Sequence, residues 1–265
     1  MANSDEPVSF SAFACALADA ARQVTLPAAY DIGSVENKGS GQTFDPVTAA
    51  DRQAELAMRA LIEARLPDHG IEGEELKARP TSGRYCWSLD PIDGTRAFIC
   101  GLPSWTTLIA LLQDGAPLVG VIDAPMVGER YLGADGAARL ITGKGSRPLT
   151  TSGCQDLAEA RLATTDPFLF TEKEGAAFER LRNTARLSRY GYDGYAYARL
   201  AAGGLDLVAE SGLKPYDWQA LVPVVRGAGG IIGNWRGGDD PSGGAVLAAA
   251  SRQLFDRASS ILEDN

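Results

Sequence analysis

Carboxylate side chains occur in four short segments of this sequence, and together they are of the types that bind divalent cations. The segments are DPVTAAD, GEE, DPIDGT and KPYDWQA, and their acidic residues are Asp45, Asp51, Glu74, Glu75, Asp90, Asp93 and Asp217. Oxygen-rich sites favour hard cations such as Mg²⁺, and a chain with one histidine has little means of building a transition-metal site on imidazole. Two such ions about 4 Å apart suit in-line attack on phosphorus, because each ion holds one of the exchanging oxygens.

The segment WSLDPIDGT, residues 87–95, combines residues suited to metal and to phosphate. Asp90 is placed to bridge two ions and Asp93 to bind one of them, while the backbone carbonyl of Ile92 adds a neutral ligand. Gly94 and Thr95 are expected to begin a helix whose free N–H groups point at an anion. The segment therefore predicts metal on one side and a phosphate group on the other.

Each acidic segment taken alone also has a plainer interpretation. Asp-Pro and Asp-Gly pairs are common turn formers, and a lone DPxDG is more often a turn than a site. GEE alone is typical of an exposed acidic loop, and Asp217 alone of a helix cap. The occurrence of all the segments in this order and spacing favours one shared site.

The elements that must position these residues follow from apolar spacing and turn residues. In the first half, helical periodicity predicts helices over 10–30 and from the N-cap Thr48, and these two helices are expected to pack together. Residues 85–95 are expected to form a strand ended by proline and glycine, and Asp114-Gly115 predicts a hairpin. In the second half, strands are expected over 160–166, 186–193 and 205–211, and helices over 172–185, 194–204, 217–230 and 251–264.

This order of elements predicts the fold class. Helices, then a mostly antiparallel sheet, then alternating strands and helices suggest an α/β (α+β) protein with layered αβαβα packing. A chain of 265 residues, of which 45% are hydrophobic, is long enough to bury a large core. A weak boundary near residue 150 divides an N-terminal α+β half, 1–150, with most of the metal ligands, from a C-terminal α/β half, 151–265, with the last metal ligand and the substrate-selecting residues.

Charge and composition limit the classes of partner. The net charge is −9 and there is no basic stripe, which argues against a nucleic-acid partner. No apolar run approaches the roughly 20 residues of a membrane helix, and the N-terminus lacks the features of a secretory signal, so we expect a cytoplasmic protein. The four cysteines lie far apart and are expected to be reduced thiols.

In order and spacing, the acidic segments resemble the inositol monophosphatase family of Mg²⁺-dependent phosphatases. DPVTAAD, IEGEE, WSLDPIDGT and YDWQA followed by GAGG match its signature segments, and the resemblance covers roughly residues 10–262. The stretches DPIDGTRAFICGLPSWTTLIALL, GVIDAPMVGERYLG and DLVAESGLKPYDWQALVPVVRGAGG are similar to the histidinol-phosphatase branch, as is Tyr216-Asp217 in place of Trp-Asp. The resemblance implies the αβαβα sandwich of the inositol monophosphatase and fructose-1,6-bisphosphatase type.

The resemblance also implies the ligands of two or three Mg²⁺ ions per site. Glu74, Asp90 and the carbonyl of Ile92 would bind the first ion. Asp90, Asp93 and Asp217 would bind the second, and Glu74 would help with a weaker third ion.

The remaining roles concern the attacking water, the phosphate and a loop. Asp51 and Thr95 would position and activate the water, with Glu75 as a further acidic group nearby. The backbone amides of Gly94 and Thr95 would hold the phosphate. Lys38 would lie in a mobile loop that closes over the site in relatives. The expected reaction is direct attack of a metal-activated water on a small phosphate monoester.

Substrate choice is expected to depend on the second half of the chain, alongside Asp93 and Asp217. Asp193 aligns where family members contact the non-phosphate part of the substrate, and Glu210 is expected to reach the same pocket. Two carboxylates there would suit the amine of L-histidinol phosphate, or would accept hydroxyl protons from a polyol. The plainer interpretations are a turn residue for Asp193 and a surface charge for Glu210.

Two further expectations follow from the resemblance, and a third follows from the position of His69. The alternatives to a histidinol-phosphatase are an inositol-1-phosphate or related sugar phosphatase and a regulatory binding protein of the same fold. The family also implies a homodimer. His69 precedes Glu74 by five residues, and we interpret it as a packing or supporting residue rather than a general acid.

Overall fold

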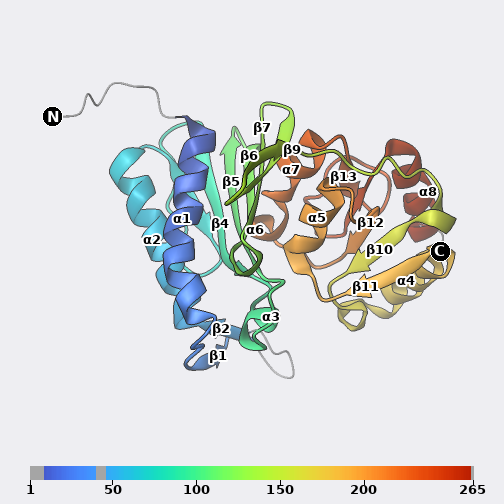
Figure 1. Ribbon diagram of the computed structural model, residues 1–265, viewed down its shortest axis with the longest axis horizontal. Helices are drawn as coiled ribbons and strands as arrows, with labels where there is room; N and C mark the ends of the chain where they lie inside the picture. The colour runs from blue at the N-terminus through green and yellow to red at the C-terminus, as the bar shows by residue number, and fades with distance from the viewer. Residues whose placement is uncertain (1–8, 40–45, 264–265) are drawn as a thin grey trace.

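Helices and sheets alternate in five layers across the molecule (Figure 1). The computed structural model describes residues 9–39 and 46–263, so Asp45 and part of the glycine- and serine-rich stretch before it lie outside the described residues. The layers run from α1 and α2 through a seven-stranded sheet, a middle layer of helices and a five-stranded sheet to α4 and α8. The predicted αβαβα fold class is confirmed.

The first layer consists of the two predicted helices, α1 (Phe10–Ala28) and α2 (Ala49–Arg65). Thr48 caps α2 as expected, with its side chain accepting a hydrogen bond from the Ala50 amide. The apolar faces of both helices bury small residues and Leu17, Met58 and Ile62 against the first sheet. The short strands β1 (Val35–Asn37) and β2 (Pro46–Thr48) pair antiparallel before α2 begins.

The first sheet has the strand order β3-β4-β5-β6-β7-β8-β9. Its strands are β3 (Gly70–Gly73), β4 (Tyr85–Asp93), β5 (Thr106–Gln113), β6 (Ala116–Ala124), β7 (Glu129–Ala134), β8 (Ala137–Thr142) and β9 (Gly145–Pro148). β3 runs parallel to β4, and every later pairing is antiparallel. The expected hairpin at Asp114-Gly115 joins β5 to β6. The short α3 (Thr95–Ile99) follows β4, and the 3₁₀ helix η1 (Pro125–Val127) follows β6.

The middle layer consists of α5 (Asp193–Ala201), α6 (Pro215–Trp218) and α7 (Leu221–Gly227). The single helix predicted over 217–230 is therefore interrupted, because α6 ends before α7 begins. Pro223 supplies the reason, since it has no N–H to donate to the carbonyl four residues earlier, at Gln219. α5 and α7 pack between the two sheets around the largest core cluster, which includes the buried Tyr131, Tyr197 and Trp218.

The second sheet has the strand order β11-β10-β12-β14-β13. Its strands are β10 (Arg161–Thr164), β11 (Leu187–Tyr190), β12 (Leu207–Glu210), β13 (Ile231–Asn234) and β14 (Val246–Ala249). β10 is parallel to β11 and β12, whereas β14 is antiparallel to both its neighbours. The helices α4 (Glu172–Thr184) and α8 (Arg252–Glu263) cover its outer face. The 3₁₀ helices η2 (Leu157–Glu159) and η3 (Pro167–Leu169) flank β10.

In the part of the chain that the structure describes, no helix combines the length and apolarity that a membrane crossing requires. The described cysteines are all free thiols. The division of the chain near residue 150 stays a prediction.

Candidate functional site

A bulge in β4 brings Asp90 and Asp93 to the same side of the sheet. Asp90 lies opposite Leu108 of β5 and Asp93 opposite Thr106. Between these two pairs β4 contains one residue more than β5. In a regular strand, residues three apart point to opposite faces, and one extra residue reverses that relation. The amide of Ile92 donates to Asp90 Oδ1 at 3.1 Å and fixes the turn. The DPID sequence therefore gathers two carboxylates instead of separating them.

Asp217 joins this pair from the middle layer. One carboxylate oxygen from each of Asp90, Asp93 and Asp217 lies within 4.8 Å of the others, and no other group of three metal-binding side chains occurs among the described residues. Asp217 ends the first turn of α6, where the Lys214 amide donates to its Oδ2 at 2.7 Å. Adjacent ligands of an octahedral Mg²⁺ stand roughly 3 Å apart and opposite ones roughly 4 Å, so the three oxygens lie close enough to converge on one ion after a small inward movement.

Two neighbours hold Asp93, and sequence reasoning missed both. Thr106 donates its hydroxyl to Asp93 Oδ2 at 2.8 Å, and the Gly194 amide donates to the same oxygen at 2.6 Å. A Cβ at Gly194 would lie 2.5 Å from that oxygen, so only glycine permits the approach. The signal available in the sequence was the glycine at the start of a predicted helix.

Glu74 and Glu75 follow β3 and face Lys38. The Lys38 Nζ lies 2.9 Å from Glu74 Oε1 and 2.6 Å from Glu75 Oε1. Beneath them, Glu55 on the buried face of α2 accepts the Glu75 amide at 2.8 Å and pairs with Arg59 at 2.7 Å. Glu55 was not predicted, although a charged residue on the apolar face of an amphipathic helix indicates a buried partner.

Asp51 has one oxygen in use and one without a partner. Its Oδ2 accepts the Thr48 amide at 2.9 Å and the Thr48 hydroxyl at 2.6 Å, which completes the capping box of α2. Its Oδ1 is buried and has no hydrogen-bond partner in the described structure. Burial raises the pKa of Asp51 despite the Thr48 bonds. An unpaired buried acceptor is costly, so this oxygen is suited to a bound water.

The β4–α3 turn follows the expected course, with α3 beginning at Thr95. The Thr95 hydroxyl donates to the carbonyl of Ile92 at 3.0 Å. Gly94 has a φ of 84°, and a Cβ there would lie 2.7 Å from Asp193 Oδ2. Glycine is therefore required both by the left-handed backbone and by the carboxylate opposite.

The site concentrates more negative charge than its cationic side chains balance. Burial, and then the carboxylates of Glu74, Asp93 and Asp217, raise the pKa of Asp90 well above its ordinary value. Burial raises the pKa of Asp93 to about 6, of Glu74 to about 7 and of Asp217 to about 8, against the hydrogen bonds and the Lys38 charge that favour ionisation. Divalent cations would relieve this repulsion, so the donor set of oxygens fits the predicted Mg²⁺.

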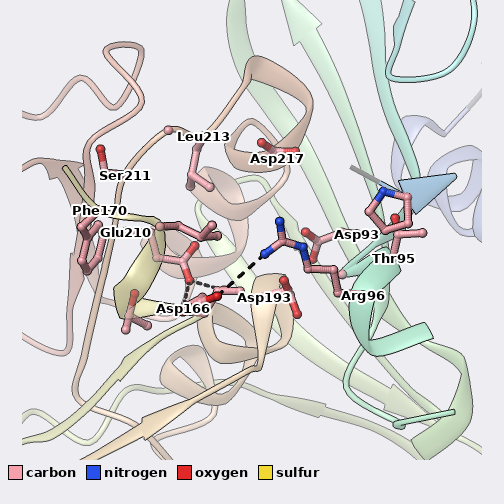
Figure 2. A pocket seen from close by; sticks show the side chains of 16 residues that line it. Asp93, Thr95, Arg96, Asp166, Phe170, Asp193, Glu210, Ser211, Leu213 and Asp217 are labelled. Carbon is pink, nitrogen blue, oxygen red and sulfur yellow. Dashed lines mark hydrogen bonds and ion pairs between the residues drawn. The ribbon is translucent and has the colours of Figure 1, made fainter. Parts of the chain in front are cut away.

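A pocket of about 280 Å³ opens beside these carboxylates, between the two halves of the chain (Figure 2). Gly94, Thr95, Asp193 and Glu210 line it together with Asp93 and Asp217. Figure 2 shows Asp193 in the middle of the pocket, close to Asp93 and Arg96, and Glu210 farther from Thr95.

The two substrate candidates are fixed in different ways, Glu210 by hydrogen bonds and Asp193 by its backbone at the start of α5. Glu210 accepts the amide and hydroxyl of Thr165 at 2.9 and 2.6 Å, and burial raises its pKa to about 7. Asp193 has a φ of 46°, which is uncommon for a residue with a side chain. Burial, followed by the charges of Asp93 and Glu210, raises the pKa of Asp193 well above its usual range.

The structure thus gathers the residues that the sequence singled out, although their individual roles stay predictions. Lys38 pairs with Glu74 and Glu75, the DPID carboxylates gather with Asp217, and Asp193 and Glu210 line the pocket beside them. His69 lies apart from this group, accepts the Trp87 indole N–H at 3.1 Å and stacks on Tyr85. It is a packing residue.

Comparison with known proteins identifies the family. The inositol monophosphatase family profile matches residues 6–265. The chain belongs to the inositol monophosphatase family. It is 45% identical over 230 residues to the bifunctional phosphatase IMPL2, chloroplastic, of Arabidopsis thaliana, which covers 86% of this chain and 65% of that one. It is 37% identical over 213 residues to a histidinol-phosphatase of Mycobacterium tuberculosis, with coverage of 77% and 79%.

A solved structure supports the same assignment. An inositol monophosphatase from Zymomonas mobilis superposes with a TM-score of 0.82 at 41% identity, covering 96% of this chain and 97% of that one. This chain is accordingly a phosphoric monoester hydrolase of the inositol monophosphatase family with a small phosphorylated substrate.

Proposed function

We propose that this protein hydrolyses L-histidinol phosphate to L-histidinol and phosphate with the help of Mg²⁺. The observation that carries the proposal is the pair Asp193 and Glu210, which line the pocket beside the metal-binding carboxylates but lie outside that group. Carboxylates in a partly dry pocket bind an ammonium group through charge-assisted hydrogen bonds. The histidinol-phosphatase name of the Mycobacterium tuberculosis relative supports the same choice.

The oxygen donors define where Mg²⁺ would be held. Asp90, Asp93 and Asp217 would form one set, and Glu74, Asp90 and the Ile92 carbonyl another. Bound there, Mg²⁺ would stabilise negative charge on the phosphoryl group and lower the pKa of a water molecule. Two or three ions per site are proposed.

The side chains of this chain would perform the remaining steps. The unpaired Oδ1 of Asp51 is suited to accept a proton from the attacking water, and the Thr95 hydroxyl to orient that water. The Gly94 and Thr95 amides would hold phosphate oxygens as the new P–O bond forms and the ester P–O bond breaks. The departing alkoxide takes a proton and leaves as the alcohol.

A panel of phosphate esters with Mg²⁺ tests the substrate. The expected result is a kcat/KM for histidinol phosphate about tenfold or more above that for inositol 1-phosphate, since each charge-assisted hydrogen bond contributes at least that factor. A value no higher than that for inositol 1-phosphate would refute the proposal.

An inositol-1-phosphate or other sugar phosphatase is the second candidate, favoured by the similarity to the Zymomonas mobilis inositol monophosphatase. Asp193→Asn separates the two. It should lower kcat/KM more for an amine substrate than for 4-nitrophenyl phosphate, and equal losses would refute the pairing of Asp193 with an ammonium. A regulatory binding role would survive Asp90→Asn, whereas hydrolysis would not. The homodimer and the cytoplasmic location stay predictions.

A further inference from the structure

The wall of the pocket that faces the metal-binding carboxylates contains a further carboxylate, Asp166, at the start of η3. Its Oδ1 accepts the Phe168 amide at 3.0 Å, so the carboxylate is fixed in orientation by its own turn. Its Oδ2 lies 3.8 Å from the Arg96 guanidinium, which Figure 2 shows reaching from α3 into the pocket. Asp166 therefore presents one oriented oxygen to the pocket.

Apolar side chains line the same pocket. Leu169 and Phe170 line the pocket, and Leu169 is 59% exposed. Phe170 is held in place by Phe178, at 5.1 Å between ring centroids, and by Trp235, at 5.5 Å. An apolar wall that is held in place at Phe170, in the same pocket as an oriented carboxylate, suits a flat ring that carries an N–H group.

The ion pair with Arg96 does not prevent this use of Asp166. The two side chains are 46% and 36% exposed, and at 3.8 Å the pair is weak. A ligand that donates a hydrogen bond at normal length can replace the guanidinium at Asp166. The positive charge of Arg96 also attracts the Asp193 carboxylate. The guanidinium can therefore stay within the acidic pocket when it leaves Asp166.

We propose that Asp166, with Leu169 and Phe170, forms a distal subsite that binds a nitrogen heterocycle of the substrate. This inference rests on the proposed function and extends it. Asp193 and Glu210 would bind the amine nearer the phosphate, and Asp166 would accept the ring N–H. The substrate class is then a phosphate monoester of an amino alcohol that carries a nitrogen heterocycle. Polyol phosphates lack the group that this subsite binds.

Asp166→Asn tests the subsite, because Asn keeps the Oδ1 that accepts the Phe168 amide and replaces the charged Oδ2 by an uncharged NH₂ donor. The readout is competitive inhibition of 4-nitrophenyl phosphate hydrolysis by L-histidinol, which has the ring, and by 2-aminopropan-1-ol, which lacks it. In the wild type, histidinol should have the lower Ki. The ratio compared is the Ki of 2-aminopropan-1-ol divided by the Ki of histidinol. In Asp166→Asn this ratio should fall about tenfold, the factor expected for one lost charge-assisted hydrogen bond.

Asp156→Asn is the matched control. Asp156 begins η2 in the same way, with its Oδ1 accepting the Ala158 amide at 3.2 Å, and it does not line the pocket. This variant should leave both Ki values unchanged. Leu169→Ser is a second variant at an exposed position, so it should fold normally, and it should lower the same ratio about threefold because apolar contact with the ring is lost.

The outcomes separate the two proposals. A wild-type enzyme that does not discriminate between histidinol and 2-aminopropan-1-ol, or an Asp166→Asn variant with an unchanged ratio, would overturn the distal subsite. The proposed function fails on a different result, namely a wild-type kcat/KM for histidinol phosphate no higher than that for inositol 1-phosphate. The subsite can therefore fail while the proposed function stands.

Discussion

At the scale of single residues, Asp51 shows how one carboxylate serves both the fold and the site. One oxygen caps α2 through Thr48, and the other is buried without a partner. Asp51→Asn keeps an acceptor for the Thr48 amide but places an amino group where the unpaired oxygen was. We expect kcat on 4-nitrophenyl phosphate to fall about 10²- to 10⁴-fold, the range for loss of a general base. The melting temperature should change little, and a variant with near-normal kcat would contradict the assignment.

Lys38 pairs with Glu74, a proposed metal ligand, so its charge is predicted to compete with metal there. Its ammonium pairs with Glu74 and Glu75 and, although burial alone would lower its pKa, these carboxylates raise it. Lys38→Gln removes this internal cation, so Mn²⁺ should bind about two- to fivefold more tightly at pH 8, the factor expected for one partly exposed ion pair. Electron paramagnetic resonance of free Mn²⁺ measures this affinity. The control Arg52→Gln, which removes an exposed ion pair with Glu36, should leave the Mn²⁺ affinity unchanged. Weaker Mn²⁺ binding in Lys38→Gln would refute competition between Lys38 and the metal.

At the scale of elements, the docking of β3 against β4 depends on the only histidine. His69, just before β3, accepts the Trp87 N–H from β4, and burial lowers its pKa. Since the folded-state pKa lies below the unfolded value, the stabilisation is present above about pH 6.5 and is lost as pH falls. His69→Gln keeps an acceptor that does not titrate. Between pH 7 and pH 5 the wild type should lose about 1 kcal/mol relative to this variant in urea unfolding, the usual net value of one hydrogen bond. Parallel pH profiles would contradict this role.

Local pattern predicted most of the elements but not how they meet. The N-cap at Thr48, the hairpin at Asp114-Gly115 and the helix start at Thr95 each depend on a few adjacent residues, and all three predictions are confirmed in the structure. The break between α6 and α7 was missed because the apolar spacing was followed through Pro223. The hydrogen bond that a proline cannot donate inside a helix was not taken into account.

Contacts between residues far apart in the chain could not be predicted from the sequence. Thr106 and Gly194 hold Asp93 from β5 and α5, and apart from the glycine at a predicted helix start nothing in their local sequence marks them as partners. The strand order of the second sheet, β11-β10-β12-β14-β13, is likewise set by packing over long separations. The gathering of the acidic segments was predicted through family resemblance, because carboxylates repel one another and no local rule draws them together.

At the scale of the whole molecule, the buried carboxylates should make stability depend on metal and pH together. The pKa values of Asp93, Glu74 and Asp217 are raised to about 6, 7 and 8. Because their ordinary values are near 4, the folded protein without metal binds more protons than the unfolded chain, and its stability is lost as pH rises through these values. The melting temperature in EDTA should therefore fall between pH 6.5 and pH 8.5.

Mg²⁺ should reverse this trend, since it binds the ionised carboxylates and its affinity grows as protons leave. At an ion concentration 100 times the dissociation constant the gain is about 2.7 kcal/mol, or roughly 5–10 °C in a chain of this size. Thermal melts at several pH values, with EDTA or with about 10 mM MgCl₂, measure the fall in melting temperature without metal and the gain from Mg²⁺. Asp217→Asn should flatten the fall in EDTA, because it removes the carboxyl group with the pKa near 8. A wild-type melting temperature that rises with pH in EDTA, or that Mg²⁺ shifts equally at every pH, would show that these carboxylates do not form one metal-linked cluster.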